Sequence, residues 1–359
     1  MRELLIICTT PFGQLTDMAK WCENIPSEVK VRAVCLKNRQ SMPQLKPNIN
    51  LIEVPVFGIR FFKGIVFILY SIFNIAVHKG PILVEYFSGC AIFKILFPRK
   101  KMVVDVRTLA VWGGQDDYSQ AIRDKYDNTL RKTVKRYDAL AVISEGVKQR
   151  IGNVRCPVYF LPLGSDVISD TPKDYTSFNI LYVGGLYERS LDHTIKGVKI
   201  FMDSHPDVTL HYDIVGGSNR GDELLLNNLA KSLNIQDYVT LHGRVEHHLL
   251  KPFFDKCSYG VSYVPITPFY NIQPPTKTYE YAMSGLVVLG TATTENMKVI
   301  NEINGVLFKD TPETFAKGLE KAWDNRYNYK EPEIRESLSE YTWSNIMTKY
   351  FMPIFNGEW

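Results

Sequence analysis

Short apolar and β-branched runs recur along the first half of the chain, with helix-length segments between several of them. The runs comprise residues 4–8, 31–36, 49–54, 82–87, 102–106, 139–143 and 158–163. The helix-length segments include residues 15–23 and 118–137. Strands that alternate with such segments predict a doubly wound α/β domain with a parallel sheet, over residues 1–165.

A second series of apolar runs begins after an aperiodic stretch rich in Asp, Thr, Pro and Lys. Its members are residues 180–183, 210–215, 239–242, 259–264, 286–289 and 306–308. This series predicts a second α/β domain over residues 179–340, joined to the first by a linker over residues 166–178. A chain of 359 residues with 45% apolar content is long enough to fill two cores.

The aromatic-rich tail, residues 341–359, is predicted to be helical up to Pro353 and to cross back from Trp343 onto the first domain. Its aromatic side chains need a surface to pack against.

The segment over residues 59–78 is the most apolar part of the chain. Its polar residues form one narrow stripe at helical spacing, namely Arg60, Lys63, Ser71, Asn74 and His78. The uninterrupted apolar part is too short to span a bilayer, which takes about 20 residues. Two interpretations remain, a helix buried between the sheet and its neighbours or an interfacial helix with basic anchors.

Charge is distributed unevenly between the two halves. The net charge is +4, but residues 1–165 contain 24 Lys+Arg and 13 Asp+Glu, whereas the remainder contains 18 and 25. This asymmetry predicts that the first domain faces a phospholipid surface, a nucleic acid or a phosphate-bearing acceptor. We expect membrane contact through five basic residues, Arg60, Lys63, Arg99, Lys100 and Lys101.

Several kinds of chemistry lack their motifs. The six cysteines are scattered, without a C-x-x-C pair, and suggest neither a disulfide framework nor a zinc site. No phosphate-binding P-loop occurs, and the Pro11-Phe12-Gly13 turn is not a dinucleotide fingerprint. His247 and His248 have no partner at metal-ligand spacing. Hydride transfer and P-loop chemistry are therefore disfavoured.

Glycine pairs follow the first two strands of the second domain, where the backbone turns sharply or approaches a ligand. These turns lie in the first two of four ordered segments, residues 180–192, 210–217, 239–245 and 274–288. Together they resemble the donor-binding domain of glycosyltransferase family 4, and residues 274–288 resemble the best-preserved stretch of its signature. Residues 141–147 and 161–166 are similar to the family's passage into the linker. Ile272 stands where the family's first glutamate is usual, and Asp105 and Arg107 stand where a histidine is often found.

This resemblance implies a GT-B fold, two Rossmann-like domains facing each other across a cleft. It implies a transfer from a nucleotide-diphosphate sugar that retains anomeric configuration and uses neither a metal ion nor another cofactor. When the bond to the sugar breaks, negative charge grows on the β-phosphate, and fixed cations lower that barrier. Arg189 and Lys277 are the catalytic candidates for this role, and the resemblance assigns Glu280 to the ribose hydroxyls.

The remaining site predictions are divided between donor and acceptor. The predicted donor-binding residues are Gly13, Gly184, Gly185, Gly216, Gly217 and Arg244. Asp105 and Arg107 lie at the end of a predicted strand, where α/β sheets bind ligands, and are assigned to the acceptor side.

The resemblance thus implies a hexosyltransferase of bacterial surface-polysaccharide synthesis. We expect a glycan acceptor carried on a polyprenyl diphosphate, and a cytoplasmic protein peripheral at the inner face of the plasma membrane. A sugar-nucleotide 2-epimerase shares the architecture but would need acid/base groups on both faces of the sugar. A degenerate paralogue that only binds nucleotide-sugar or polysaccharide is the second alternative, and Ile272 is its best support. Nucleic-acid binding is disfavoured because no recognisable module interleaves basic and aromatic residues.

Overall fold

The computed structural model describes residues 3–13, 16–37, 45–55, 60–109 and 120–356. The described residues form two compact units. The first comprises residues up to 164 together with the tail from residue 343, and the second comprises residues 165–342.

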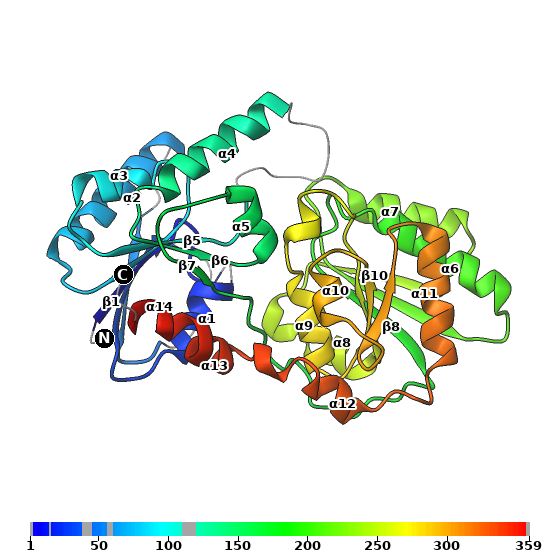
Figure 1. Ribbon diagram of the computed structural model, residues 1–359. Coiled ribbons are helices and arrows are strands. Elements are labelled where there is room, and N and C mark those ends of the chain that lie inside the picture. Colours follow the sequence, from blue (N-terminus) through cyan, green and yellow to red (C-terminus); the bar gives the residue numbers. More distant parts are fainter. Residues whose placement is uncertain (1–2, 14–15, 38–44, 56–59, 110–119, 357–359) are drawn as a thin grey trace. The chain divides into compact units, whose positions relative to one another are not determined.

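The first unit is built on a seven-stranded parallel sheet in the order β3-β2-β1-β4-β5-β6-β7 (Figure 1). The strands are β1 (Glu3–Ile7), β2 (Lys30–Leu36), β3 (Ile49–Val54), β4 (Ile82–Glu85), β5 (Met102–Val106), β6 (Ala139–Val142) and β7 (Val158–Phe160). Each corresponds to one of the predicted apolar runs. The strand order reverses between β1 and β4, and ligands of open α/β sheets bind at the carboxyl ends of the strands at such a reversal.

The helices of the first unit are α1 (Thr16–Asn24), α2 (Arg60–Val77), α3 (Ala91–Leu96), α4 (Gln120–Val134) and α5 (Glu145–Ile151). The helices predicted over residues 15–23 and 118–137 form as α1 and α4 within the described residues. Local signals fix α5, because the Ser144 side chain accepts a hydrogen bond from the Val147 backbone amide at 3.2 Å. Gly152 ends the helix with a φ of 83°.

Helix α2 is not enclosed on all sides, contrary to the first interpretation of its sequence, and the interfacial interpretation stays a prediction. Its polar residues Ser71, Asn74 and His78 are buried, at most 4% exposed, and its apolar residues Leu69 and Phe73 are 59% and 67% exposed. The side chains of Ser71 and Asn74 donate to backbone oxygens one turn earlier, at 2.8 and 2.9 Å. The polar stripe therefore faces the protein. No helix among the described residues is long and apolar enough to cross a membrane.

The second unit contains a six-stranded parallel sheet in the order β10-β9-β8-β11-β12-β13. Its strands are β8 (Phe178–Val183), β9 (Leu210–Val215), β10 (Val239–Gly243), β11 (Tyr259–Ser262), β12 (Val287–Thr291) and β13 (Gly305–Phe308). Its helices are α6 (Leu191–Ser204), α7 (Asp222–Ser232), α8 (Lys251–Lys256), α9 (Thr276–Met283), α10 (Asn296–Val299), α11 (Pro312–Asp324) and α12 (Glu331–Glu336). The strand order reverses between β8 and β11. All six predicted runs form strands, and the prediction of two Rossmann-like sheets is confirmed.

Residues 166–178, which the sequence assigns to the linker, are bonded into the second unit, and residue 178 already begins β8. The Tyr175 hydroxyl donates to the Gly285 carbonyl at 2.9 Å, and the Ser169 hydroxyl donates to Asp255 at 2.6 Å. Arg335 also donates to the Ser169 carbonyl at 2.7 Å. The segment lacks hydrophobic periodicity, which is why the sequence suggests a linker. Polar contacts, which leave no periodic pattern in the sequence, hold it in the second unit.

The tail packs within the first unit. It runs through α13 (Trp343–Ile346), a π-helical turn over Met347–Phe351 and α14 (Met352–Asn356). The Phe351 ring lies 5.2 Å from that of Trp21 on α1, between ring centroids. The helix continues past Pro353, contrary to the prediction that it ends there. Proline lacks a backbone N–H, and its place at the start of α14, after a π-helical turn, accommodates this loss.

Candidate active site

Two glycine turns close the carboxyl ends of β8 and β9 in the second unit. Gly184 has a φ of 149°, outside the range that other residues adopt readily. A Cβ atom on Gly216 would lie 1.8 Å from the Gly184 carbonyl oxygen, so only glycine lets these two turns approach so closely. A Cβ atom on Gly217 would in turn lie 3.2 Å from Cβ of Arg244, which follows β10. Three neighbouring strand ends are thereby packed backbone to backbone.

Lys277, in the first turn of α9, extends its ammonium group under this glycine edge. The Nζ atom lies 3.8 Å from the ring centroid of Tyr182. It would be 3.1 Å from a Cβ atom on Gly184. The ammonium is buried and has no hydrogen-bond partner among the described residues. Burial, and then the charge of Arg189, lower the pKa of Lys277 well below its ordinary value.

Arg189 lies in the loop between β8 and α6. Its guanidinium donates to the hydroxyl of Tyr270 and stacks over the same ring at 4.5 Å from the centroid. The residues on either side, Glu188 and Ser190, have φ values of 54° and 50°. Left-handed backbone at two non-glycine residues is strained and persists where surrounding structure enforces it, a feature that clusters at functional sites.

Glu280 follows Lys277 by three residues on α9, so both side chains lie on the same helix face. Its Oε1 atom lies 3.3 Å from Nε2 of His247, which is half exposed. Glu280 lies one turn inside α9. The strand reversal between β8 and β11, the glycine turns, two cations and one carboxylate thus share one edge of the sheet.

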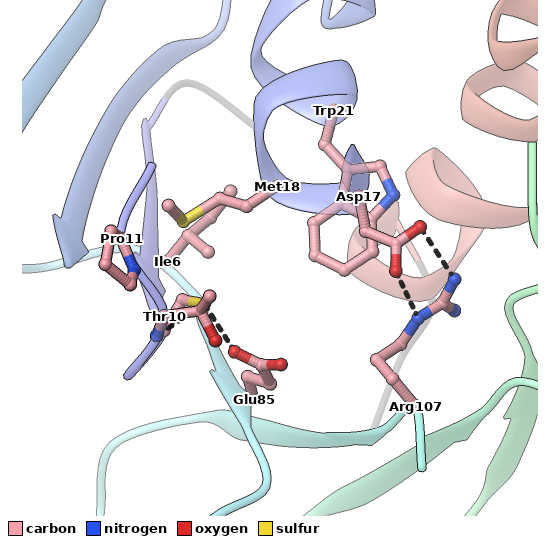
Figure 2. Close-up of a pocket in the computed structure, with 9 residues that line it drawn as sticks. Ile6, Thr10, Pro11, Asp17, Met18, Trp21, Glu85 and Arg107 are labelled. Atoms are coloured by element: carbon pink, nitrogen blue, oxygen red, sulfur yellow. Dashed lines mark hydrogen bonds and ion pairs between the residues drawn. The ribbon is translucent and has the colours of Figure 1, made fainter. Parts of the chain in front are cut away.

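A second cluster lies at the corresponding reversal in the first unit, between β1 and β4 (Figure 2). Asp17 of α1 faces Arg107, which follows β5, and its two carboxylate oxygens lie 3.1 Å from Nε and Nη2. Glu85, at the end of β4, lines the same pocket and accepts a hydrogen bond from the Cys8 thiol. Burial raises the pKa of the Glu85 carboxyl, and the charge of Asp17 raises it further.

Asp105 lies beneath this cluster and is fully buried. Neither of its oxygens accepts a hydrogen bond from the described residues, and Nε of Arg107 is 3.8 Å from Oδ2. Burial raises the pKa of Asp105 to about 8, against the attraction of Arg107 and with the repulsion of Asp17. Asp105 is therefore largely protonated at neutral pH. Asp105 does not line the pocket, whereas Asp17, Glu85 and Arg107 do, and the assignment of Asp105 to the acceptor side stays a prediction.

The second unit is similar to a known protein family. Residues 167–343 match the sequence model of the family described as Glycosyl transferases group 1. The second unit is a glycosyltransferase domain. A comparison with curated proteins gives no match.

Solved structures similar to the whole chain confirm its GT-B fold. Sucrose-phosphate synthase from Thermosynechococcus elongatus has a TM-score of 0.77 at 15% identity, over 99% of this chain and 98% of that one. WaaG, a glycosyltransferase involved in lipopolysaccharide biosynthesis, has a TM-score of 0.72 at 15% identity, over 99% and 100%. Anabaena Alr3699/HepE, solved with UDP and glucose, has a TM-score of 0.74 at 11% identity, over 100% of both chains.

In the glycosyltransferase domain, the predicted residues Arg189, Lys277 and Glu280 are brought to one edge together with the four glycines of the two Gly-Gly turns. Arg244 is exposed in the loop beside Gly217. Gly13 belongs to the first unit, where it has a φ of 78° in the turn after β1. Its assignment to the donor stays a prediction.

The sequence interpretation missed three side chains of this edge, Tyr182, Tyr270 and His247. Tyr182 alternates with apolar residues in β8 and gives no signal of its own. Tyr270 lies in the 3₁₀ turn over Tyr270–Ile272 that also contains Ile272, the residue in place of the family's first glutamate. This turn reaches Arg189 through the Tyr270 hydroxyl. His247 was taken for a surface residue, and its contact with Glu280 joins positions 33 residues apart.

The five residues predicted to contact a membrane differ in exposure and in their hydrogen bonds. Arg60 lies at the first position of α2, and its side chain is outside the described set. Arg99 and Lys101 are exposed in the turn before β5, and Lys63 is partly exposed on α2. Lys100 instead binds the end of α2, because its ammonium donates to the carbonyl oxygens of Ala76 and His78. Lys100 thereby satisfies a helix C-terminus.

Proposed function

We propose that the protein transfers a hexose from a nucleoside-diphosphate sugar, bound at the edge around Lys277, to a glycan acceptor. The observation that carries this proposal is the Lys277 ammonium, which is buried without a hydrogen-bond partner among the described residues. An unsatisfied buried polar group costs about 1–3 kcal/mol, and a protein retains such a group where a ligand completes it. A diphosphate supplies the missing anionic acceptors.

The chemistry follows from where charge develops. As the bond between the anomeric carbon and the β-phosphate oxygen breaks, that oxygen gains negative charge. Lys277 supplies a compact positive charge and Arg189 a forked set of donors. Because both cations are already held in the site before the reaction, the site is preorganised for the departing diphosphate. The Tyr270 hydroxyl and ring fix the orientation of Arg189.

Other residues of the edge fit the rest of the donor. Glu280 is oriented by His247 and has a second carboxylate oxygen that can accept ribose hydroxyl hydrogens. Gly185 has open space where its Cβ atom would lie, so its backbone is accessible to phosphate oxygens. The backbone of Arg244, after β10, lines the place assigned to the nucleotide base. The resemblance to glycosyltransferase family 4 supports transfer with retention of configuration and without a metal ion.

We assign the acceptor to the pocket of the first unit. Asp17, Glu85 and Arg107 offer carboxylate acceptors and guanidinium donors, the groups that bind sugar hydroxyls. The excess of basic residues in the first half supports an acceptor carried on a polyprenyl diphosphate at the inner face of the plasma membrane, in surface-polysaccharide synthesis. The cytoplasmic leaflet is anionic and attracts basic segments.

The test is donor turnover by purified protein with UDP-, GDP- and ADP-sugars, measured as nucleoside diphosphate release. Lys277→Ala, Arg189→Ala and Glu280→Ala are each expected to lower kcat/KM while the fold is kept. A lost phosphate contact corresponds to about 3 kcal/mol, or about a 100-fold decrease. Lys196→Ala is the control, because this lysine of α6 in the same unit is partly exposed and forms an ion pair with the partly exposed Asp192 at 2.7 Å. Unchanged kcat/KM in all three variants would place the donor elsewhere.

A further inference from the structure

Helices α2 and α3 present a large apolar surface on the first unit. Along α2 the exposed apolar residues recur at helical spacing, and α3 adds three more. They are Phe62, Ile65, Leu69, Tyr70, Phe73 and Val77 on α2, and Ile92, Ile95 and Leu96 on α3. Large exposed apolar patches on soluble proteins mark interaction surfaces, whereas isolated exposed apolar residues are common.

The orientation of α2 is the second observation about this surface, because polar side chains of the helix face the protein and large apolar ones face outward. A helix that faces water turns its polar stripe outward and buries its apolar face. In α2, Ser71 and Asn74 are buried together with the apolar Phe67 and Ile75, whereas Leu69 and Phe73 are 59% and 67% exposed. His78, directly after the helix, is buried as well. These polar groups are satisfied inside the protein. For example, the His78 ring nitrogen Nε2 lies 3.1 Å from the Pro81 carbonyl oxygen. The helix is therefore arranged for an apolar environment on its outer side.

Helices α2 and α3 both pack against Phe87, which follows β4. The Phe87 ring lies 5.9 Å from Phe67 of α2 and 5.9 Å from Phe93 of α3, between centroids. At the other end, Lys100 bonds to the last turn of α2 and brings the basic run after α3 beside it. Basic side chains thus border the apolar residues.

The charge of the residues around α2 and α3 distinguishes a lipid surface from a protein partner. Between residues 54 and 104 the sequence contains seven Lys+Arg and a single acidic residue, Glu85. Lys94 is buried and paired with Asp138, and Lys100 is bonded to the end of α2. The basic side chains at the surface of the described residues are therefore Lys63, Lys79, Arg99 and Lys101. Glu85 lies in the pocket of the first unit, where it is bonded to Cys8. A protein partner of ordinary mixed charge would not need so one-sided a border, whereas an anionic lipid leaflet matches it.

We propose that the α2–α3 surface inserts into the headgroup region of an anionic bilayer, with α2 lying in the plane of the interface. This inference deepens the membrane location given under the proposed function, and it rests on that proposal only for the biological membrane concerned. Leu69 and Phe73 enter the acyl boundary, and Lys63, Arg99 and Lys101 contact lipid phosphates. The first unit would thus hold its acceptor pocket close to lipid-linked molecules.

The test is flotation of the purified full-length protein with vesicles, without donor or acceptor. Vesicles of phosphatidylglycerol and phosphatidylethanolamine are compared with vesicles of phosphatidylcholine alone. We expect binding to the anionic vesicles, weak binding to the neutral ones, and weaker anionic binding as salt shortens the screening length below about 10 Å. Leu69→Ser with Phe73→Ser should lower affinity by about 100-fold, since each buried side chain contributes about tenfold.

Matched variants separate the apolar contribution from unfolding and from charge. Leu224→Ser with Leu225→Ser removes two equally exposed leucines, each 65% exposed, from α7 of the second unit and should leave vesicle binding unchanged. Lys63→Glu with Arg99→Glu should lower anionic binding by at least about 25-fold, at about fivefold for each basic residue. Circular dichroism and donor turnover in the absence of vesicles should match the unaltered protein in all three variants.

Three results would overturn the inference. One is an unaltered protein that stays unbound with anionic vesicles at low salt. Another is undiminished binding by the Leu69→Ser, Phe73→Ser variant. The third is a dimer in sedimentation that these two substitutions dissociate, which would assign the surface to a second copy of the chain. Absent donor turnover with the expected vesicle binding would refute only the proposed function.

Discussion

Replacement of Lys277 by methionine is predicted to stabilise the unliganded protein and to abolish most of its activity. Methionine keeps the length and apolar stem of lysine but removes the charge that has no hydrogen-bond partner among the described residues. A residue with a structural role would show the opposite change in stability. This single substitution therefore distinguishes a binding group from a structural one.

The magnitude follows from two opposing contributions. An unsatisfied buried polar group destabilises by about 1–3 kcal/mol. The contact of the ammonium with the Tyr182 ring, 3.8 Å from its centroid, returns about 0.5–2 kcal/mol. A net gain of about 1 kcal/mol remains for the variant, which raises Tm by about 2–4 °C in a domain of this size.

The pH dependence has a definite sign. Because the pKa of Lys277 is lowered in the folded protein, the unfolded chain binds more protons between that lowered value and the ordinary 10.5. The stability of the unaltered protein therefore falls as pH decreases through this window. The Tm advantage of Lys277→Met should consequently be larger at about pH 7 than at about pH 10, and calorimetry at both values measures it.

Ligand should reverse the order of the two proteins. A nucleoside diphosphate stabilises the folded state by RT ln(1 + [L]/Kd), and Lys277→Met should bind it about 100-fold more weakly. With saturating UDP, GDP or ADP, whichever binds, the unaltered protein should melt above the variant. A variant that melts lower than the unaltered protein without ligand, and shows the same shift with it, would refute the role assigned to Lys277.

Four further substitutions test individual contacts. Gly184→Ala should lower Tm, because its φ is 149° and the new Cβ atom meets the Lys277 ammonium, whereas Gly185→Ala should keep Tm but weaken donor binding. Burial raises the pKa of Asp105 to about 8, so the folded protein retains a proton there that the unfolded chain loses. The stability of Asp105→Asn relative to the unaltered protein should therefore increase as pH rises from about 4 to about 8. An unchanged difference in Tm between the two proteins across this range would contradict this. His247→Ala should raise the donor KM with little change in kcat, because it only orients Glu280.

The sheets were predictable because strands buried on both faces appear as apolar runs. Every predicted run became a strand, including the short one that forms β7 (Val158–Phe160). The Lys277 and Glu280 positions could also be predicted, since they lie in one continuous segment. The partners of the site were not predictable, because Tyr270 and His247 reach it from separate loops whose paths depend on tertiary packing.

Helix α2 shows where pattern reasoning fails for a physical reason. Its narrow polar stripe and wide apolar face indicated a helix, and the helix formed. Which face turns inward depends on what lies outside the protein, and an amphipathic pattern alone contains no such information. The inward direction of Ser71, Asn74 and His78 became visible only in the folded unit.

The central claim, a nucleotide-sugar donor site built on Lys277, is tested most directly by sugar transfer or donor hydrolysis with a panel of UDP-, GDP- and ADP-sugars. We predict nucleoside diphosphate release with at least one donor, reduced about 100-fold in Lys277→Met and unchanged in Lys196→Ala. Binding of the nucleotide without any release would favour the degenerate paralogue. Equal release by the unaltered protein and Lys277→Met would contradict the claim.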